Sequence, residues 1–197
     1  MHDDDLDRTT NGHGPVAQIT YADLCHLEAG SWFSESFSGI KIPTLEEAIE
    51  VILARDLGVN LEIKPCPGRE KETAEAMLDH LSQFWDDRDR LLISSFSHVS
   101  LEIAAEMAED WYRGLLLESD PIPNWLELAD HLDVTTINID GRTAEREFVE
   151  DILDTQRMIL AYTINDPQLA LQLRQWGVDA MFTDDPDAVN DALFKPH

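Results

Sequence analysis

The sequence predicts an α/β protein built on a parallel sheet. Two observations lead to this fold class. From about residue 44 onward, short apolar runs of strand length alternate with longer segments whose apolar residues recur at helical spacing. The connections between them are short, and no repeat or low-complexity segment interrupts the series. Six βα units in succession favour parallel pairing, because parallel neighbours need a crossover segment between them.

The elements can be placed in order along the chain. Thr44 and Glu47 form a capping box before the first apolar stripe, and Gly58 is the expected stop of that helix. Asp166 and Pro167 have the residue types of an N-cap and a first helical position. The expected strands are 59–64, 91–96, 114–117, 134–139, 158–164 and 180–183, and the expected helices are 45–57, 70–85, 99–108, 124–132, 144–153, 167–176 and 186–193.

The first of these strands carries charge. It reads Val-Asn-Leu-Glu-Ile-Lys over residues 59–64, and Pro65 ends it. Side chains alternate faces along a strand, so Glu62 and Lys64 are expected on the same face, near its carboxyl end. Burying these charges is costly unless they pair with each other or bind something. Ligands bind at the carboxyl edge of parallel α/β sheets, so this strand end is a candidate site.

The charge balance is unusual. Forty acidic residues against 14 basic ones give a formal net charge of −26. The acidic residues are dispersed over expected helix faces, and lysines are few, a composition typical of a halophilic or salt-requiring source. An ordinary acidic protein is the alternative. Nucleic-acid binding is disfavoured, because no basic patch is present to neutralise phosphates.

The remaining composition indicates a globular protein of one domain. Apolar residues make up 43% of the chain, and no apolar run reaches membrane-spanning length. Cys25 and Cys66 are far apart, so reduced thiols are the simplest interpretation, and a disulfide between them stays open. No charged-then-apolar leader is visible either, so we expect a cytoplasmic protein.

Several short motifs, in order along the chain, resemble those of the glycerophosphodiester phosphodiesterase family. No single motif is specific, but their shared order covers nearly the whole chain. The motifs are the opening His2-Asp-Asp-Asp, Leu27-Glu-Ala-Gly-Ser-Trp-Phe, Ile42-Pro-Thr-Leu-Glu-Glu-Ala, the Glu-Ile-Lys of residues 62–64, Ile93-Ser-Ser-Phe, Tyr162-Thr-Ile-Asn and Gly177-Val-Asp-Ala-Met-Phe-Thr-Asp-Asp-Pro.

The resemblance implies a TIM-type (βα)8 barrel. Residue pattern alone does not separate such a barrel from an open doubly wound sheet. On the resemblance, residues 41–197 supply the last six βα units, residues 3–40 form the family's insertion, and 1–197 is one domain. The family's earlier His-Arg-Gly and Glu-x-Asp motifs are absent from this sequence. We therefore expect a barrel missing its first two strands, whose open edges either make it unstable alone or are covered by another chain, such as a second copy.

The resemblance also assigns roles to individual residues. Glu62 corresponds to a ligand of a divalent cation, Mg²⁺ or Ca²⁺, although a salt bridge with Lys64 is the alternative. Lys64 is expected to contact the phosphoryl group. His2 matches the family's second catalytic histidine, against the alternative of an exposed terminal histidine. Tyr162 stands where relatives often have Trp and is expected to shape the glycerol pocket. Trp32 and Phe33 are candidate substrate-side groups of the insertion, and core packing is the favoured alternative for both.

The implied reaction is metal-dependent hydrolysis of glycerophosphodiesters to sn-glycerol 3-phosphate and an alcohol, in lipid catabolism. Because Glu62 lacks the other carboxylates and His2 lacks its partner histidine, we expect the cation to be bound weakly or not at all. We therefore expect impaired activity. The competing hypothesis is a non-catalytic truncated paralogue or interaction module. Another phosphodiester-cleaving barrel, such as a phospholipase, is a more distant possibility.

The charge balance generates a stability prediction. In dilute buffer the 26 excess negative charges repel one another, and at 1 M salt the screening length shortens to roughly 3 Å. The thermal unfolding midpoint should therefore rise substantially between low and molar salt, as followed by circular dichroism. An unchanged midpoint would leave only a generically acidic protein.

Overall fold

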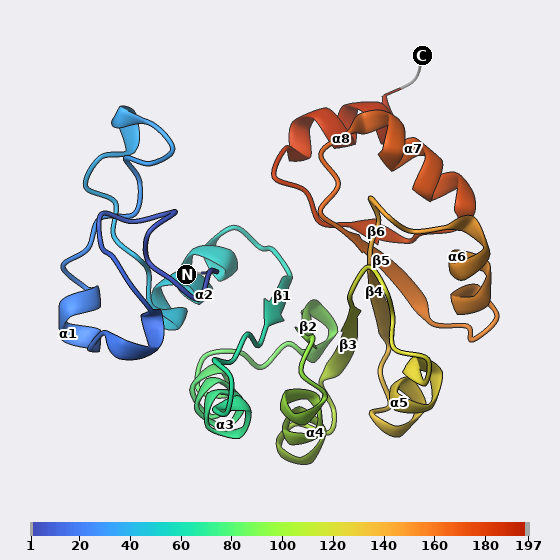
Figure 1. Ribbon diagram of the computed structural model, residues 1–197, viewed down its shortest axis with the longest axis horizontal. Coiled ribbons are helices and arrows are strands. Elements are labelled where there is room, and N and C mark those ends of the chain that lie inside the picture. Colours follow the sequence, from blue (N-terminus) through green and yellow to red (C-terminus); the bar gives the residue numbers. More distant parts are fainter. Residues whose placement is uncertain (1, 196–197) are drawn as a thin grey trace. The chain divides into compact units, whose positions relative to one another are not determined.

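The computed structural model describes residues 2–195, so Met1, Pro196 and His197 of the expected single domain lie outside the described part. Internal contacts group the chain into two compact units. Unit 1 comprises the residues up to 58 together with 64–86, and unit 2 comprises 59–63 and 87–197. Figure 1 labels the helices and strands of both units.

Unit 2 contains a six-stranded parallel sheet. Its strands pair in chain order, each with the next, and Figure 1 shows the sheet curling as the strands succeed one another. This curled, half-barrel arrangement with alternating helices confirms the predicted fold class. The strands are β1 (Val59–Glu62), β2 (Leu91–Ser95), β3 (Tyr112–Leu117), β4 (Thr136–Asp140), β5 (Met158–Tyr162) and β6 (Ala180–Met181).

Helices follow the strands of unit 2 and cover the outer face of its sheet. Ile137 and Ile139 of β4 are buried there in the main hydrophobic core. Thr136, Asn138 and Asp140 alternate with them and therefore point to the inner face. The helices are η3 (Arg88–Arg90), α4 (His98–Met107), α5 (Trp125–His131), α6 (Arg146–Leu153), α7 (Pro167–Trp176) and α8 (Pro186–Phe194).

Helix α7 begins at the N-cap that the sequence predicts, and α8 begins at a cap of the same kind. The carboxylate of Asp166 accepts a hydrogen bond from the backbone N–H of Gln168 at 2.8 Å, and Pro167 is the first residue of α7. Asp185 accepts from the N–H of Ala188 at 3.1 Å at the start of α8. Gly177 ends α7 in the left-handed region, with φ of 109°, which glycine adopts without strain.

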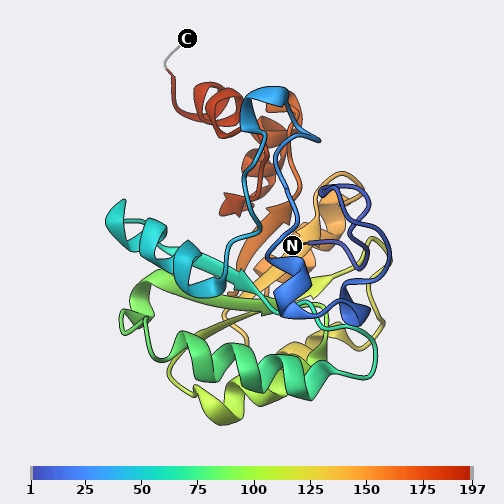
Figure 2. The same cartoon turned by 90° about the vertical axis from the view of Figure 1, so that its left-hand side faces the viewer.

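Unit 1 is mostly loop before residue 42, drawn in blue in Figure 2, with only short helical turns. The Glu28 carboxylate organises this loop by accepting from the N–H groups of Gly30 and Ser31, both at 2.7 Å. Position 30 has room only for glycine, because a Cβ there would lie 1.9 Å from the Phe37 carbonyl oxygen. The helices are η1 (Val16–Gln18), α1 (Tyr21–Leu24), η2 (Glu35–Phe37), α2 (Leu45–Ala54) and α3 (Glu70–Leu81).

Helix α2 begins as predicted and ends earlier than predicted. Its capping box is complete: Thr44 Oγ1 accepts from the Glu47 N–H at 3.2 Å, and the Glu47 carboxylate accepts from the Thr44 N–H at 2.8 Å. Gly58 is not the stop. The helix ends at Ala54, and Asp56 takes the left-handed conformation with φ of 56°. Aspartate is among the few non-glycine residues that tolerate this region, so the glycine was not needed.

The charged strand is also shorter than predicted. β1 ends at Glu62, and the N–H of Ile63 extends its pairing by one bond to the Ser94 carbonyl at 2.8 Å. Lys64 therefore lies beyond the strand, is exposed, and belongs to unit 1. Strand β6 is similarly shortened to two residues, and α3 stops at Leu81.

A buried hydroxyl at the end of β2 generates a stability prediction. Ser95 Oγ donates to the Ile63 carbonyl at 2.6 Å and accepts from the Ser97 N–H at 3.0 Å, away from solvent. Ser95→Ala should lower the free energy of unfolding by about 1–3 kcal/mol, because buried partners lose their hydrogen bonds. Urea unfolding measures the change. The exposed Ser38→Ala is the control, and equal effects of the two would contradict the assignment.

Candidate functional site

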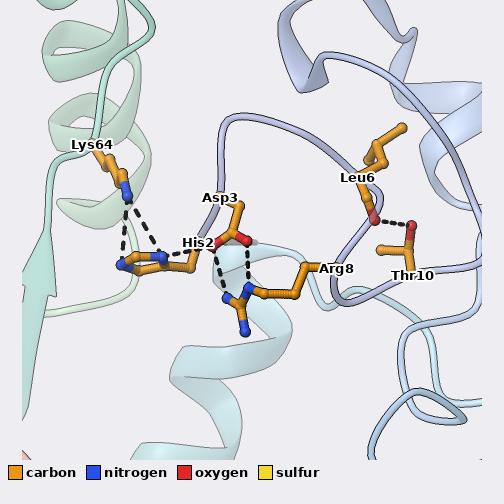
Figure 3. Close-up of polar contacts among 6 residues, drawn as sticks. All are labelled: His2, Asp3, Leu6, Arg8, Thr10 and Lys64. Carbon is orange, nitrogen blue, oxygen red and sulfur yellow. Dashed lines mark hydrogen bonds and ion pairs between the residues drawn. The ribbon is translucent and has the colours of Figure 1, made fainter.

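Two of the predicted site residues lie together in unit 1. The Lys64 ammonium is 3.5 Å from each ring nitrogen of His2, although 62 positions separate them in sequence (Figure 3). The chain near His2 is anchored by Leu6, which is 2% exposed, and by the Thr10 hydroxyl, which donates to the Leu6 carbonyl at 2.7 Å. A cation and an imidazole are thus held side by side, both open to solvent.

Asp3 connects His2 to Arg8. His2 Nδ1 lies 2.9 Å from Asp3 Oδ1, and the same carboxylate receives two bonds from Arg8, at 2.5 Å from Nε and 2.7 Å from Nη2. The Arg8 hydrogen bonds, followed by that of His2, hold the pKa of Asp3 well below its usual range. An ionised Asp3 fixes the orientation of the ring and leaves Nε2 as the nitrogen available for proton transfer.

The aromatic residues of the insertion are not in a core. Trp32, Phe33 and Phe37 form a chain of edge-to-face contacts, with ring centroids 5.8 and 5.5 Å apart, and all three are exposed. The Arg8 guanidinium lies 5.9 Å from the centre of the Trp32 ring. The core position expected for Trp32 is therefore wrong, because the short helices of the insertion enclose too little volume to cover these rings.

The other two predicted residues lie in unit 2, at the carboxyl ends of its strands. Glu62 is the last residue of β1 and Tyr162 the last of β5. The Tyr162 hydroxyl donates a hydrogen bond of 2.6 Å to the Leu117 carbonyl at the end of β3. The Tyr162 ring packs edge-to-face against the Phe96 ring, with the ring centroids 5.7 Å apart. Burial raises the pKa of Tyr162. The negative charges of Glu118, Asp140 and, to the smallest extent, Glu62 raise this pKa further.

Sequence reasoning missed a cluster at the end of β4. The Asp140 carboxylate, on a residue only 6% exposed, accepts from Arg142 Nε at 3.0 Å and Nη2 at 2.8 Å. It also accepts from Ser119 Oγ at 2.9 Å and from the Arg142 N–H at 3.1 Å. These bonds, those of the Arg142 side chain foremost, lower the pKa of Asp140. A signal was available: polar residues occupy every second position of residues 136–140.

A cavity of about 310 Å³ opens beside this cluster, with Asp140 and Ser119 in its lining. The acidic residues Glu118, Asp120 and Glu145 also line it, so the charge around the cavity is negative. An anionic substrate is not attracted by these walls, and Arg142 is the positive group of the adjoining cluster.

The divalent cation expected at Glu62 lacks a ligand set. Among residues 2–195 no group of three or more His, Cys, Asp or Glu side chains is arranged to hold a metal ion. A hard cation such as Mg²⁺ or Ca²⁺ needs several oxygen ligands, so the described residues taken alone do not fit it. Cys25 and Cys66 are both free thiols, so the alternative of a disulfide between them is wrong. Within the same range, no helix has the length and apolarity to cross a membrane.

The Asp140 cluster generates a pH prediction. Because the folded-state pKa is lowered, its stabilisation is present above the usual aspartate value of 3.8 and is lost as pH falls below it. Asp140→Asn should cost about 1.5–3 kcal/mol at pH 7, measured by urea unfolding, and progressively less towards pH 3. The exposed ion-pair carboxylate of Asp130 provides the control, Asp130→Asn, expected within about 1 kcal/mol of wild type. A cost for Asp140→Asn that does not change with pH would exclude ionisation as its cause.

Comparison with known proteins identifies the family of this chain. The glycerophosphoryl diester phosphodiesterase family model matches residues 1–188. A glycerophosphodiester phosphodiesterase of Caldanaerobacter subterraneus is 32% identical over 99% of this chain and 79% of its own length. One from Bacillus subtilis is 30% identical over 95% of this chain and 69% of its own.

A solved phosphodiesterase of Oleispira antarctica, in complex with the product sn-glycerol-3-phosphate, is 39% identical with a TM-score of 0.93. The match covers 99% of this chain and 78% of that one. The family predicted from the motifs is thus confirmed. This chain belongs to the glycerophosphoryl diester phosphodiesterase family, whose named relatives are phosphoric diester hydrolases.

Proposed function

We propose that this chain hydrolyses glycerophosphodiesters to sn-glycerol 3-phosphate and an alcohol, with His2, Lys64, Glu62 and Tyr162 as its site residues. The observation that carries the proposal is the approach of the Lys64 ammonium to His2, at 3.5 Å from both ring nitrogens. A fixed cation beside an imidazole is the pairing that cleavage of an anionic diester needs.

Each residue of this pair has a separate task. Lys64 neutralises a non-bridging phosphoryl oxygen as negative charge increases there in the transition state. His2, oriented by Asp3 through Nδ1, transfers a proton at Nε2 to or from the reacting oxygen. In this proposal Tyr162 borders the glycerol moiety, and its bond to the Leu117 carbonyl fixes the position of its ring.

The substrate class is supported by the relatives. The solved Oleispira antarctica enzyme was obtained with sn-glycerol-3-phosphate as its product, and its identity to this chain is 39%. Cleavage of a diester that carries glycerol 3-phosphate on one side releases the alcohol from the other. Deacylated phospholipids are diesters of this kind, which is why we assign the reaction to lipid catabolism.

We further propose that a divalent cation, when bound, involves Glu62 and supplies charge that stabilises the transition state. Because the described residues do not complete a ligand set, binding to these residues alone should be weak. The same observation favours one competing proposal, a non-catalytic paralogue that retains the family fold without its turnover.

Two properties of the chain complete the proposal. Within the described residues, β1 and β6 each pair with only one neighbouring strand, so a second copy of the chain is our proposed cover for these edges. The charge of −26 leads us to propose a salt-requiring protein, and the free thiols of Cys25 and Cys66 lead us to propose a cytoplasmic one.

The first activity prediction concerns a polypeptide that has only these 197 residues. It should hydrolyse glycerophosphocholine negligibly, even with added Mg²⁺ or Ca²⁺, because one carboxylate holds a hydrated ion poorly. Adding an N-terminal extension that carries the family's His-Arg-Gly and Glu-x-Asp motifs should restore turnover, measured as release of sn-glycerol 3-phosphate. Strong cation-dependent activity of the 197 residues alone would show that other groups supply the ligands.

The second activity prediction concerns individual residues in the extended, active form. Lys64→Ala and Glu62→Ala should each lower kcat/KM by at least about 10²-fold, because each removes charge stabilisation of the transition state. Lys71→Ala is the matched control, since Lys71 is an exposed lysine paired with Glu75 and should have no effect. An inactive extended form would instead favour the non-catalytic paralogue.

A further inference from the structure

The segment Asp140-Gly-Arg142 directs two charged side chains to the same face of unit 2. Gly141 lies between them and faces the hydrophobic core. A Cβ at this position would lie 2.6 Å from Ile164 Cδ1 and 2.8 Å from Leu173 Cδ1. Only glycine fits there without displacing core side chains, so the backbone passes close against the core. Continued alternation then places residue 142 on the inner side with Asp140, where its side chain meets the carboxylate.

The Arg142 guanidinium is hydrogen-bonded along one of its edges, and its other edge is open. Its Nε and Nη2 atoms donate to the two oxygens of Asp140, at 3.0 and 2.8 Å. Guanidinium is planar and carries five N–H donors, so the edge formed by Nη1 and the second Nη2 hydrogen remains available. The Arg142 side chain is 65% exposed, and that of Asp140 only 6%, so the arginine is the member of the pair that faces solvent.

The neighbours of Arg142 are residues of the proposed site. In the sheet, Asp140 is the register partner of Tyr162, and the Gly141 N–H donates to the Tyr162 carbonyl at 3.0 Å. The Tyr162 hydroxyl reaches the Leu117 carbonyl at the end of β3, and the Tyr162 ring contacts the ring of Phe96. The two rings together form an aromatic pair near the carboxyl edge. Arg142 therefore lies near Tyr162, the residue proposed to border the glycerol moiety.

We propose that Arg142 is a substrate-binding residue whose free guanidinium edge contacts a negatively charged oxygen of the glycerophosphodiester. This inference rests on the proposed function and adds a specificity determinant to it. Planar bidentate contact with a phosphate or carboxylate is the interaction for which arginine is suited. In a chain of net charge −26, a fixed cation at the strand ends gives an anionic substrate a local point of attraction.

The test is a binding measurement, so it does not depend on turnover. The wild-type chain, Arg142→Gln and Arg146→Gln are titrated by NMR at constant ionic strength with sn-glycerol 3-phosphate, inorganic phosphate, glycerophosphoserine and glycerophosphocholine. Arg146 is a close control, because its side chain is 67% exposed and it pairs with Glu150 at 2.8 Å. We expect Arg142→Gln to weaken at least one anionic probe about tenfold or more, and Arg146→Gln to leave all four within about twofold.

The probes separate two sources of the negative charge. If the phosphoryl group is the contact, Arg142→Gln weakens sn-glycerol 3-phosphate and inorganic phosphate together. If a carboxylate on the alcohol is the contact, it weakens only glycerophosphoserine, and glycerophosphocholine is retained. Arg142→Lys keeps the charge without the planar fork and should bind with intermediate affinity. It also serves as the test variant if Arg142→Gln does not fold, as judged by circular dichroism.

Two results would overturn the inference. If Lys64→Ala weakens the probes while Arg142→Gln and Arg142→Lys match Arg146→Gln, the proposed function stands and the role of Arg142 is wrong. If no probe binds the wild-type chain, the proposed function and the role of Arg142 both fail.

Discussion

The strict alternation of side chains along the strands of unit 2 is the constraint on which its other features depend. One face of the sheet is apolar and packs against helices, as Ile137 and Ile139 show. The inner face receives the residues between them, which are polar at Thr136, Asn138 and Asp140. A slip of one residue in register would turn the polar set towards the apolar core and the apolar set towards the inner face, so the register is strongly determined. The register therefore also determines which way the side chains at the carboxyl edge point.

The elements that sequence predicted well are those with a local physical signal. The capping box of Thr44 and Glu47 and the Asp166 cap of α7 are formed as expected, because each is decided by bonds within a few residues. The prediction that helix α2 stops at Gly58 was wrong, and the cause is again local. A glycine permits a left-handed residue but does not require it, and Asp56 took that conformation first.

The site was predicted unevenly, for a physical reason. Its charged strand end could be read from the sequence, but Lys64 lies past the strand, because pairing stops within two residues of Glu62. The Asp140 and Arg142 pair escaped detection, since two opposite charges two residues apart at the end of a strand usually form an exposed ion pair of small effect. The alternation of polar residues over 136–140 was the available signal, but what distinguishes this pair is the burial of one member, and the degree of that burial depends on packing over β4.

Gly141 couples the packing of the core of unit 2 to the position of the charged residues at the end of β4. Its Cα faces Ile164 and Leu173 of the core, and its two neighbours are the charged residues at the strand end. Changes in the volume of those core side chains would therefore shift the backbone that carries the guanidinium. Homologues that differ in the size of either core residue would then differ in where the cation lies, although every residue around a bound ligand is the same. A change in the size of a core side chain during evolution can thus alter ligand preference in a way that a comparison of the ligand-contacting residues alone would not detect.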